Sequence, residues 1–253
     1  MLMPIADDNS DRRIFPIVNY VLIGLNVLVF IALQGAGTDI NFTYAYATVP
    51  AEILTGSDIV TNAKVLTDPL TGQQFEMPGL QPTPGSVYFT LITSMFMHGG
   101  WGHLLGNMLY LYIFGDNLEN RLGSGRYLIF YLITGVLASL AHVFSTYLTP
   151  GSELIPSLGA SGAISAVLGA NLLLFPGRKV KALLGWTVVT VPLLIALGLW
   201  IVFQIVSGLG MLGGASDGVA YAAHIGGFFA GLLLVKFFDQ GKVAPAQNPR
   251  RTR

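Results

Sequence analysis

Four polar residues interrupt long apolar stretches of this sequence and carry groups that could do chemistry. His103 and Asn107 lie four positions apart, Ser161 stands in a Gly-Ala-Ser-Gly run, and His224 precedes Ile-Gly-Gly. A serine hydroxyl beside a neutral imidazole can act as a nucleophile, and amide or imidazole N–H groups can stabilise an oxyanion. These residue types predict acyl transfer, provided that the fold brings them to one place.

The composition predicts that the surrounding elements lie in a membrane. Of the 253 residues, 53% are hydrophobic and only 10% are charged, and the mean hydropathy is +0.63. A soluble domain carries about 25% charged residues. The 13 basic and 13 acidic residues give a net charge of zero, which predicts no nucleic-acid partner. The absence of cysteine excludes disulfides, thiolate catalysis and cysteine metal sites.

Six apolar segments are long enough, or nearly so, to cross a bilayer core of about 30 Å. They are 14–33, 101–118, 126–147, 161–176, 183–208 and 219–238. We therefore expect an all-α membrane protein in which a six-helix transmembrane bundle covers residues 14–238, with tails at 1–13 and 239–253. The long segment 35–100 should form a loop, with a turn near 68–72 and a small hairpin around it.

The basic residues predict the orientation of this bundle. Twelve of the 13 Lys and Arg residues lie in the two tails, in the connections after spans two and four, or at the end of span six; only Lys64 lies in the long loop. Lys and Arg concentrate on the cytoplasmic side of membrane proteins. Both termini should therefore be cytoplasmic and the loop 35–100 should face outward, in a plasma or bacterial inner membrane.

This orientation places the four polar residues at a similar depth. Spans two, four and six all run inward, and His103, Asn107 and His224 lie near the outer ends of spans two and six. Span four is only about 24 Å long at 1.5 Å per residue, so its first residue, Ser161, should lie below the outer surface. The four side chains can therefore meet in the outer leaflet.

Small residues predict which spans approach closely. Gly159 and Gly162 belong to a run of small residues at the start of span four, and Gly227 and Gly231 form a GxxxG pattern on the histidine face of span six. Such faces permit close backbone contact between membrane helices. This contact should bring the serine and histidine within hydrogen-bond reach.

Each feature has a simpler explanation when it is taken alone. A Gly-Ala-Ser-Gly run can serve packing, a single intramembrane histidine can be a satisfied buried group, and His103 with Asn107 can bond across helices. His98, Trp101 and His142 are expected to be structural. It is the convergence of the four groups at one depth that favours a site.

The sequence lacks the residues that other intramembrane proteases and proton-coupled transporters require. A zinc metalloprotease needs a motif such as H-E-x-x-H, and the stretch 98–103 has no glutamate. An aspartyl protease needs two central carboxylates, but Asp116 is the only candidate and lies at the inner end of its span. A proton-coupled transporter would show buried acids or lysines. We expect neither a metal nor a cofactor.

The ordered motifs resemble those of the rhomboid family of intramembrane serine proteases. They are His98–Asn107 (HGGWGHLLGN), Glu119–Gly125 (ENRLGSG), Gly159–Gly162 (GASG) and Ala223–Gly231 (AHIGGFFAG). The resemblance implies that Ser161 is the nucleophile and His224 its base in a catalytic dyad. It also implies that Asn107, His103 and the Ser161 N–H form the oxyanion hole, and that the substrates are transmembrane proteins.

One departure concerns the histidine. Many family members carry an aromatic residue four positions after the serine, whereas this chain has Ser165. The sequence leaves open which group orients His224. It also leaves an alternative function, that of an inactive rhomboid-like protein that binds or escorts membrane clients, although such relatives generally lack the serine or the histidine.

Overall fold

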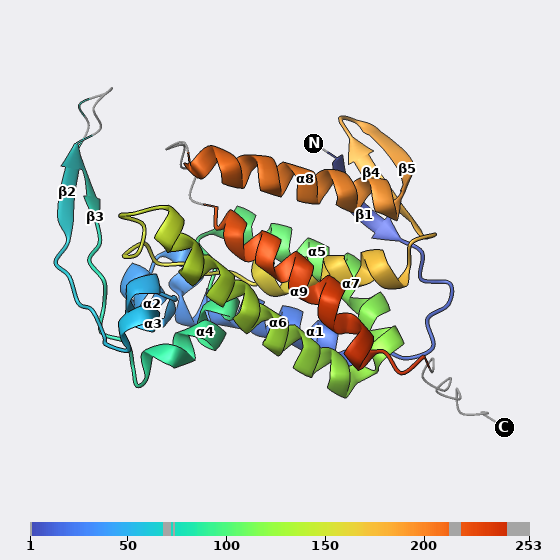
Figure 1. Ribbon diagram of the computed structural model, residues 1–253, viewed down its shortest axis with the longest axis horizontal. Coiled ribbons are helices and arrows are strands. Elements are labelled where there is room, and N and C mark those ends of the chain that lie inside the picture. Colours follow the sequence, from blue (N-terminus) through green and yellow to red (C-terminus); the bar gives the residue numbers. More distant parts are fainter. Residues whose placement is uncertain (1, 68–71, 73, 213–218, 242–253) are drawn as a thin grey trace.

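The computed structural model describes residues 2–67, 72, 74–212 and 219–241 (Figure 1). Long helices make up most of the molecule, and each of them overlaps one of the predicted apolar segments. They are α1 (Ile17–Leu28, continued by a π-helical turn over Val29–Leu33), α5 (Trp101–Leu122), α6 (Ser124–Ser145), α7 (Ser161–Leu174), α8 (Leu193–Leu212) and α9 (Tyr221–Phe238).

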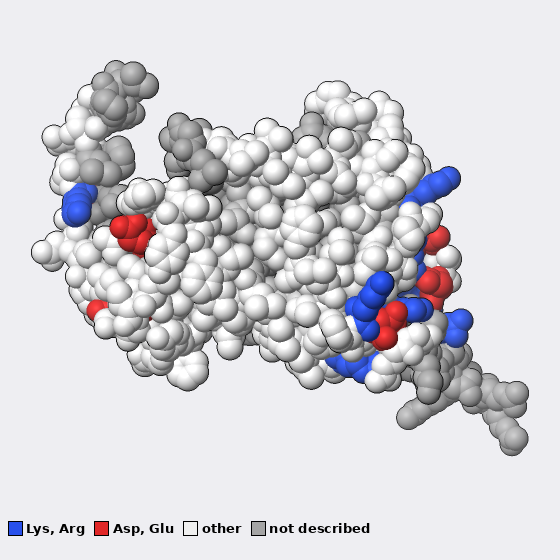
Figure 2. Space-filling view, in the orientation of Figure 1, with Lys and Arg blue, Asp and Glu red and all other residues white. Residues whose placement is uncertain are grey.

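The surface of the bundle is largely uncharged between its two ends. Figure 2 shows Lys and Arg side chains gathered at the end that carries the strands β1 (Leu2–Asp7), β4 (Lys179–Leu184) and β5 (Thr187–Pro192), with a broad white band beside them. By length and composition, three helices in the described ranges can cross a membrane, namely Ser124–Leu148, Leu193–Gly210 and Tyr221–Phe238. The helices Ile17–Leu33 and Ser161–Leu174 are apolar but shorter.

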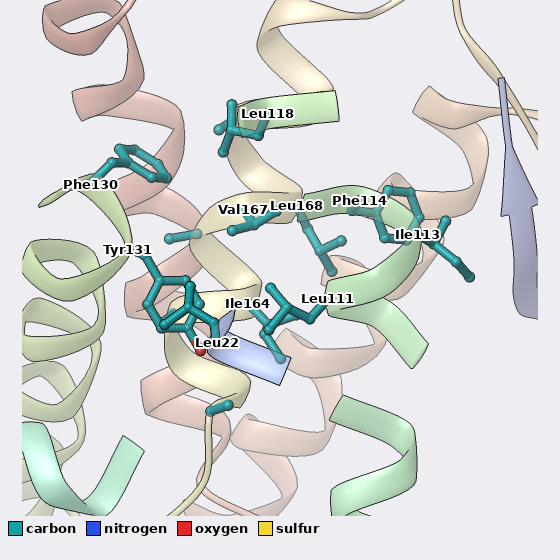
Figure 3. Packing of buried hydrophobic residues seen from close by; sticks show 14 of the residues in the cluster. Leu22, Leu111, Ile113, Phe114, Leu118, Phe130, Tyr131, Ile164, Val167 and Leu168 are labelled. Atoms are coloured by element: carbon teal, nitrogen blue, oxygen red, sulfur yellow. The ribbon is translucent and has the colours of Figure 1, made fainter. Parts of the chain in front are cut away.

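The short helix α7 forms the centre of the bundle. It packs against α5, α6, α8 and α9, and every residue from Gly162 to Asn171 is buried. Ile164 and Leu168 of α7 belong to the same buried cluster as Leu111 of α5 and Tyr131 of α6 (Figure 3). A helix that is apolar all round is typical of a buried core position or of a membrane span.

α7 and α9 approach so closely that their backbones touch. A methyl group on Gly227 would lie 2.1 Å from the carbonyl oxygen of Gly162, and one on Gly231 would lie 2.0 Å from that of Ala166. Both distances are well inside van der Waals contact, so a side chain at either position would push the helices apart. This is the helix pair that the small residues predicted.

Buried polar groups join α1, α5 and α6 at the end of the bundle near β1. The Glu119 carboxylate accepts hydrogen bonds from the N–H groups of Val18 (3.1 Å) and Asn19 (2.7 Å). It thereby satisfies amides at the start of α1 that have no partner within the helix. The Asn19 side chain donates to the Leu111 carbonyl (3.0 Å) and accepts from the Tyr127 hydroxyl (2.7 Å).

The segment 35–100 folds into short elements over one end of the bundle. They are α2 (Ile40–Tyr46), α3 (Pro50–Thr55), β2 (Lys64–Thr67), β3 (Gln74–Met77) and α4 (Thr90–Thr93), the last flanked by 3₁₀ turns. The predicted hairpin is confirmed, because β2 and β3 pair antiparallel with Lys64 opposite Met77. The turn predicted at 68–72 lies, apart from Gly72, outside the described residues.

The all-α prediction is wrong for a second sheet at the opposite end of the molecule (Figure 1). β1 (Leu2–Asp7), β4 (Lys179–Leu184) and β5 (Thr187–Pro192) form an antiparallel sheet in the order β1-β4-β5. Residues 183–192, assigned above to the fifth span, belong to this sheet because their β-branched run favours a strand. The predicted tail 1–13 therefore includes a paired strand, while most of the tail 239–253 lies outside the described residues.

Asp7, the last residue of β1, lies in a cluster of charged groups. It accepts a hydrogen bond from the Asn117 side chain, and Arg12 pairs with the neighbouring Asp116. Burial, together with the Asp116 carboxylate, raises the pKa of Asp7 to about 7, although Arg178 and Arg12 act in the opposite direction. The folded protein therefore holds a proton on this group that the unfolded chain releases above about pH 4.

The backbone contact of α7 with α9 predicts a stability difference between two glycines. Gly231→Ala should lower the free energy of unfolding by about 1–3 kcal/mol, because the added methyl overpacks the contact. Gly24→Ala in α1 is the matched control, since nothing lies within 4 Å of a methyl group there; it should leave stability equal or slightly higher. Thermal unfolding in detergent measures both, and equal midpoints would contradict the contact.

The raised pKa of Asp7 predicts a pH dependence of stability. A carboxyl whose folded pKa lies above its unfolded value stabilises the fold at low pH, and this contribution is lost as the pH rises from about 4 to about 7. Asp7→Asn should therefore raise the unfolding midpoint at pH 8 and change it little at or below pH 4. Asp8→Asn, which alters an exposed carboxylate, should not reproduce this effect. An unchanged pH profile in Asp7→Asn would contradict it.

Candidate active site

Ser161 is the first residue of α7, and the turn before it is fixed by backbone hydrogen bonds. The Gly159 N–H donates to the Ser94 carbonyl (2.9 Å), and Thr48 pairs with Ser157 in an antiparallel bridge. Gly159 adopts a φ of +125°, a conformation that favours glycine. The serine therefore sits at a helix N-terminus, where backbone N–H groups have no acceptor within the helix.

His224 lies in the first turn of α9 and contacts this serine directly. The Ser161 hydroxyl and His224 Nε2 are 2.7 Å apart and hydrogen-bonded. The rings of Trp200 and Tyr221 lie with their centroids 6.1 Å and 6.4 Å from that of the imidazole. α8 and α9 thus supply the aromatic surroundings of the histidine, which position 165 does not.

His103 and Asn107 reach the same place from α5. A methyl group on Gly159 would lie 2.8 Å from Cε1 and Nε2 of His103 and 3.7 Å from Ser161 Oγ, so the imidazole edge stands beside the serine. The Gly99 N–H donates to His103 Nδ1 (3.4 Å), which leaves the proton of a neutral ring on Nε2.

Asn107 presents an unused donor. Its side chain is 8% exposed. Among the described residues, its Nδ2 is one of the buried polar atoms with no hydrogen-bond partner. An unsatisfied buried amide costs about 1–3 kcal/mol, so such groups are rare and often functional.

A single cavity of about 1200 Å³ holds Ser161, His224, His103 and Asn107. Its walls come from α2, α5, α6, α7, α8, α9 and the segment 145–158. It exceeds the usual 300–1,000 Å³ of small-molecule pockets and has room for an extended peptide. The structure therefore brings all four predicted residues together in one cavity.

The other residues that the sequence singled out have different surroundings. Gly159 does not pack between helices, since it forms the turn against His103. His98 is held by Gln34, which accepts from its N–H (2.9 Å) and donates to its carbonyl (3.0 Å), and its ring meets that of His103 edge-on. Trp101 packs edge-on against Phe30, and the remaining histidine, His142, lines the cavity.

Sequence reasoning missed one residue that contacts the site. Gln204 of α8 lies with Oε1 2.7 Å from His224 Nδ1. The available signal was an amide in an otherwise apolar helix, the only Asn or Gln of the segment 183–208. Ser165, by contrast, donates its hydroxyl to the Ser161 carbonyl (2.6 Å).

Comparison with known proteins identifies the family. Residues 85–240 match the family model described as the Rhomboid domain. Rhomboid protease GluP of Bacillus subtilis (strain 168) is 36% identical over 149 residues, which are 58% of this chain and 26% of that protein. Rhomboid protein 1, mitochondrial, of Saccharomyces cerevisiae is 34% identical over 167 residues, or 64% and 44% of the two chains. RHOMBOID-like protein 4 of Arabidopsis thaliana is 33% identical over 150 residues, or 59% and 34%.

The chain belongs to the rhomboid family, whose members are in general serine proteases embedded in membranes. The matches cover less than half the length of each of these three relatives.

Proposed function

We propose that this chain is an intramembrane serine endopeptidase that cuts membrane proteins in or near their transmembrane segments. The observation that supports this most directly is the 2.7 Å hydrogen bond between Ser161 Oγ and His224 Nε2 inside the cavity. The printed name of the GluP relative, a rhomboid protease, agrees with it.

In the proposed mechanism, Ser161 is the nucleophile and His224 is the general base. His224 Nε2 takes the hydroxyl proton while Oγ attacks the carbonyl carbon of the scissile peptide bond. The imidazolium then gives this proton to the departing amine, which leaves an acyl group on the serine. A neutral imidazole suits the first step because Nε2 must have a free lone pair.

The proposed oxyanion hole consists of the Asn107 amide, the His103 Nε2–H and the Ser161 backbone N–H. Each is a donor that the resting fold leaves near the serine, and the N-terminus of α7 adds a favourable dipole for negative charge. Donors fixed before the reaction stabilise the developing oxyanion at no further cost of reorganisation.

Hydrolysis of the acyl group consumes water, which the cavity can admit. Three serines, Ser145, Ser152 and Ser157, are among the residues that line its wall. A water molecule beside His224 would give a proton to Nε2 and attack the acyl carbon. The imidazolium would then return the proton to Ser161 Oγ as the C–O bond to the serine breaks, which releases the acyl group as a carboxylic acid and restores the hydroxyl.

The proposed substrates are single-span membrane proteins with small residues at the cleaved bond. The active site would lie in the outer leaflet of a plasma or bacterial inner membrane, six helices would span the bilayer, and both termini would be cytoplasmic. The uncharged band in Figure 2 and the basic end that carries β1 support this arrangement.

The proposal predicts that both members of the Ser–His pair are needed for activity. Ser161→Ala and His224→Ala should each lower the rate at which the purified protein cleaves a model transmembrane substrate at least about 1,000-fold. The serine and the histidine act together as one catalytic pair, so the loss of either should abolish most of the activity. A fluorophosphonate should label the wild type and not Ser161→Ala. Ser207→Ala on α8 is the control, and it should keep both activities.

The outcomes separate the two functions left open by the sequence. Cleavage by Ser161→Ala at the wild-type rate would refute the nucleophile. A wild type that neither cleaves nor reacts with the fluorophosphonate would favour the alternative, an inactive rhomboid-like protein that binds membrane clients.

The oxyanion role of Asn107 predicts a loss of activity without a loss of stability. Asn107→Ala should lower kcat about 100- to 1,000-fold with little change in KM, since the lost bond forms only in the transition state. The unfolding midpoint should stay near the wild-type value because Nδ2 has no partner in the resting fold. Full turnover in Asn107→Ala would assign the oxyanion to other donors.

A further inference from the structure

The hydrogen bond between Gln204 and His224 points to a role that the Ser–His pair alone does not provide. We propose that Gln204 is a positioning residue, whose amide oxygen holds the imidazole in the tautomer and orientation that the reaction requires. This inference rests on the proposed protease function and adds a third side chain to it.

The geometry determines which nitrogen carries the proton. The Ser161 hydroxyl can donate to His224 Nε2 only if that nitrogen is unprotonated, so a neutral ring must carry its proton on Nδ1. In the 2.7 Å contact, His224 Nδ1–H then donates and Gln204 Oε1 accepts. A ring in the other tautomer would lose the hydrogen bond to Gln204, because an amide oxygen only accepts, and its Nε2 would have no lone pair to take the Ser161 proton.

The packing around Gln204 on α8 restricts the motion of its side chain. The side chain is 5% exposed, and Trp200, one turn earlier on the same face, packs against the imidazole and the ring of Phe228. The opposite face of α8, which includes Leu199, Val202 and Val206, is exposed to the surroundings. Gln204 thus faces the site from a helix whose other side is suited to lipid.

A neutral acceptor fits this location better than a carboxylate. In soluble serine proteases an aspartate orients the histidine and stabilises its charged form. A carboxylate within an apolar bundle costs several kcal/mol to bury. Gln204 supplies the orienting oxygen without that charge. The Ser165 hydroxyl makes a different contact, since it donates to the Ser161 carbonyl (2.6 Å).

The test compares two side chains of similar length that differ in the acceptor. Gln204→Met removes the oxygen and should lower kcat and the rate of fluorophosphonate labelling about tenfold, the value of one hydrogen bond, with KM unchanged. Gln204→Glu keeps a carbonyl-type oxygen, which a protonated carboxyl group presents without a buried charge, and it should stay within about threefold of the wild type. Val206→Ala, which alters an exposed position of the same helix, should match the wild type.

A second measurement does not depend on activity. The chain has only four histidines, so ¹⁵N-histidine NMR in detergent, assigned with His224→Asn, can identify the tautomer of His224. The wild type should be protonated on Nδ1, and Gln204→Met should populate the Nε2–H form.

Two results would overturn the inference. One is a Gln204→Met protein with the wild-type labelling rate and the wild-type tautomer. The other is an equal loss in Gln204→Met and Gln204→Glu accompanied by a raised KM, which would indicate a general packing role. If Ser161→Ala is still labelled, the proposed function fails, while the NMR comparison still decides whether Gln204 sets the tautomer.

Discussion

The contact between the backbones of α7 and α9 is the constraint on which the site depends. A methyl group on Gly169 would lie 2.1 Å from the carbonyl oxygen of Phe228, so the two helices touch along much of their length. Ser161 immediately precedes this contact on α7, and His224 lies one turn before Gly227 on α9. A slip of one residue along either helix would move a side chain by about 1.5 Å, enough to break a 2.7 Å hydrogen bond.

Buried hydrogen bonds fix the helices at both ends of the bundle. At the end near β1, the Glu119 and Asn19 side chains satisfy buried donors and acceptors and join three helices. At the other end, Gln34 holds the backbone of His98 and thereby the start of α5. The side chains of Glu119, Asn19 and Gln34 are thus hydrogen-bonded, whereas Asn107 Nδ2 is among the buried polar atoms that lack a partner within the described part of the chain. Such a donor can stay unsatisfied only where the surrounding packing keeps it in place.

Much of the site could be predicted because helical periodicity and membrane depth are local properties of the sequence. The four-residue spacing places His103 and Asn107 on one helix face. The small residues around Ser161 and the glycines after His224 likewise indicate which helix faces meet, and none of this requires knowledge of the fold. Gln204 could not be found in this way, because its role depends on the rotation of α8 and on which neighbour faces it. The sheet was missed for a related reason: hydropathy counts the apolar residues 183–192 as part of a span, and the partner of β4 lies far away in the sequence, at Leu2–Asp7.

The pairing of β1 with β4 has a consequence for the biogenesis of the protein. Leu2 lies opposite Leu184 and Asp7 opposite Val180, so the two strands leave the ribosome on the order of ten to forty seconds apart at about 5–20 residues per second. During that interval α1, α5, α6 and α7 are synthesised, while β1 has no partner with which to complete its ladder. The sheet can therefore close only after the central helix has been made, which places its formation among the late steps of assembly.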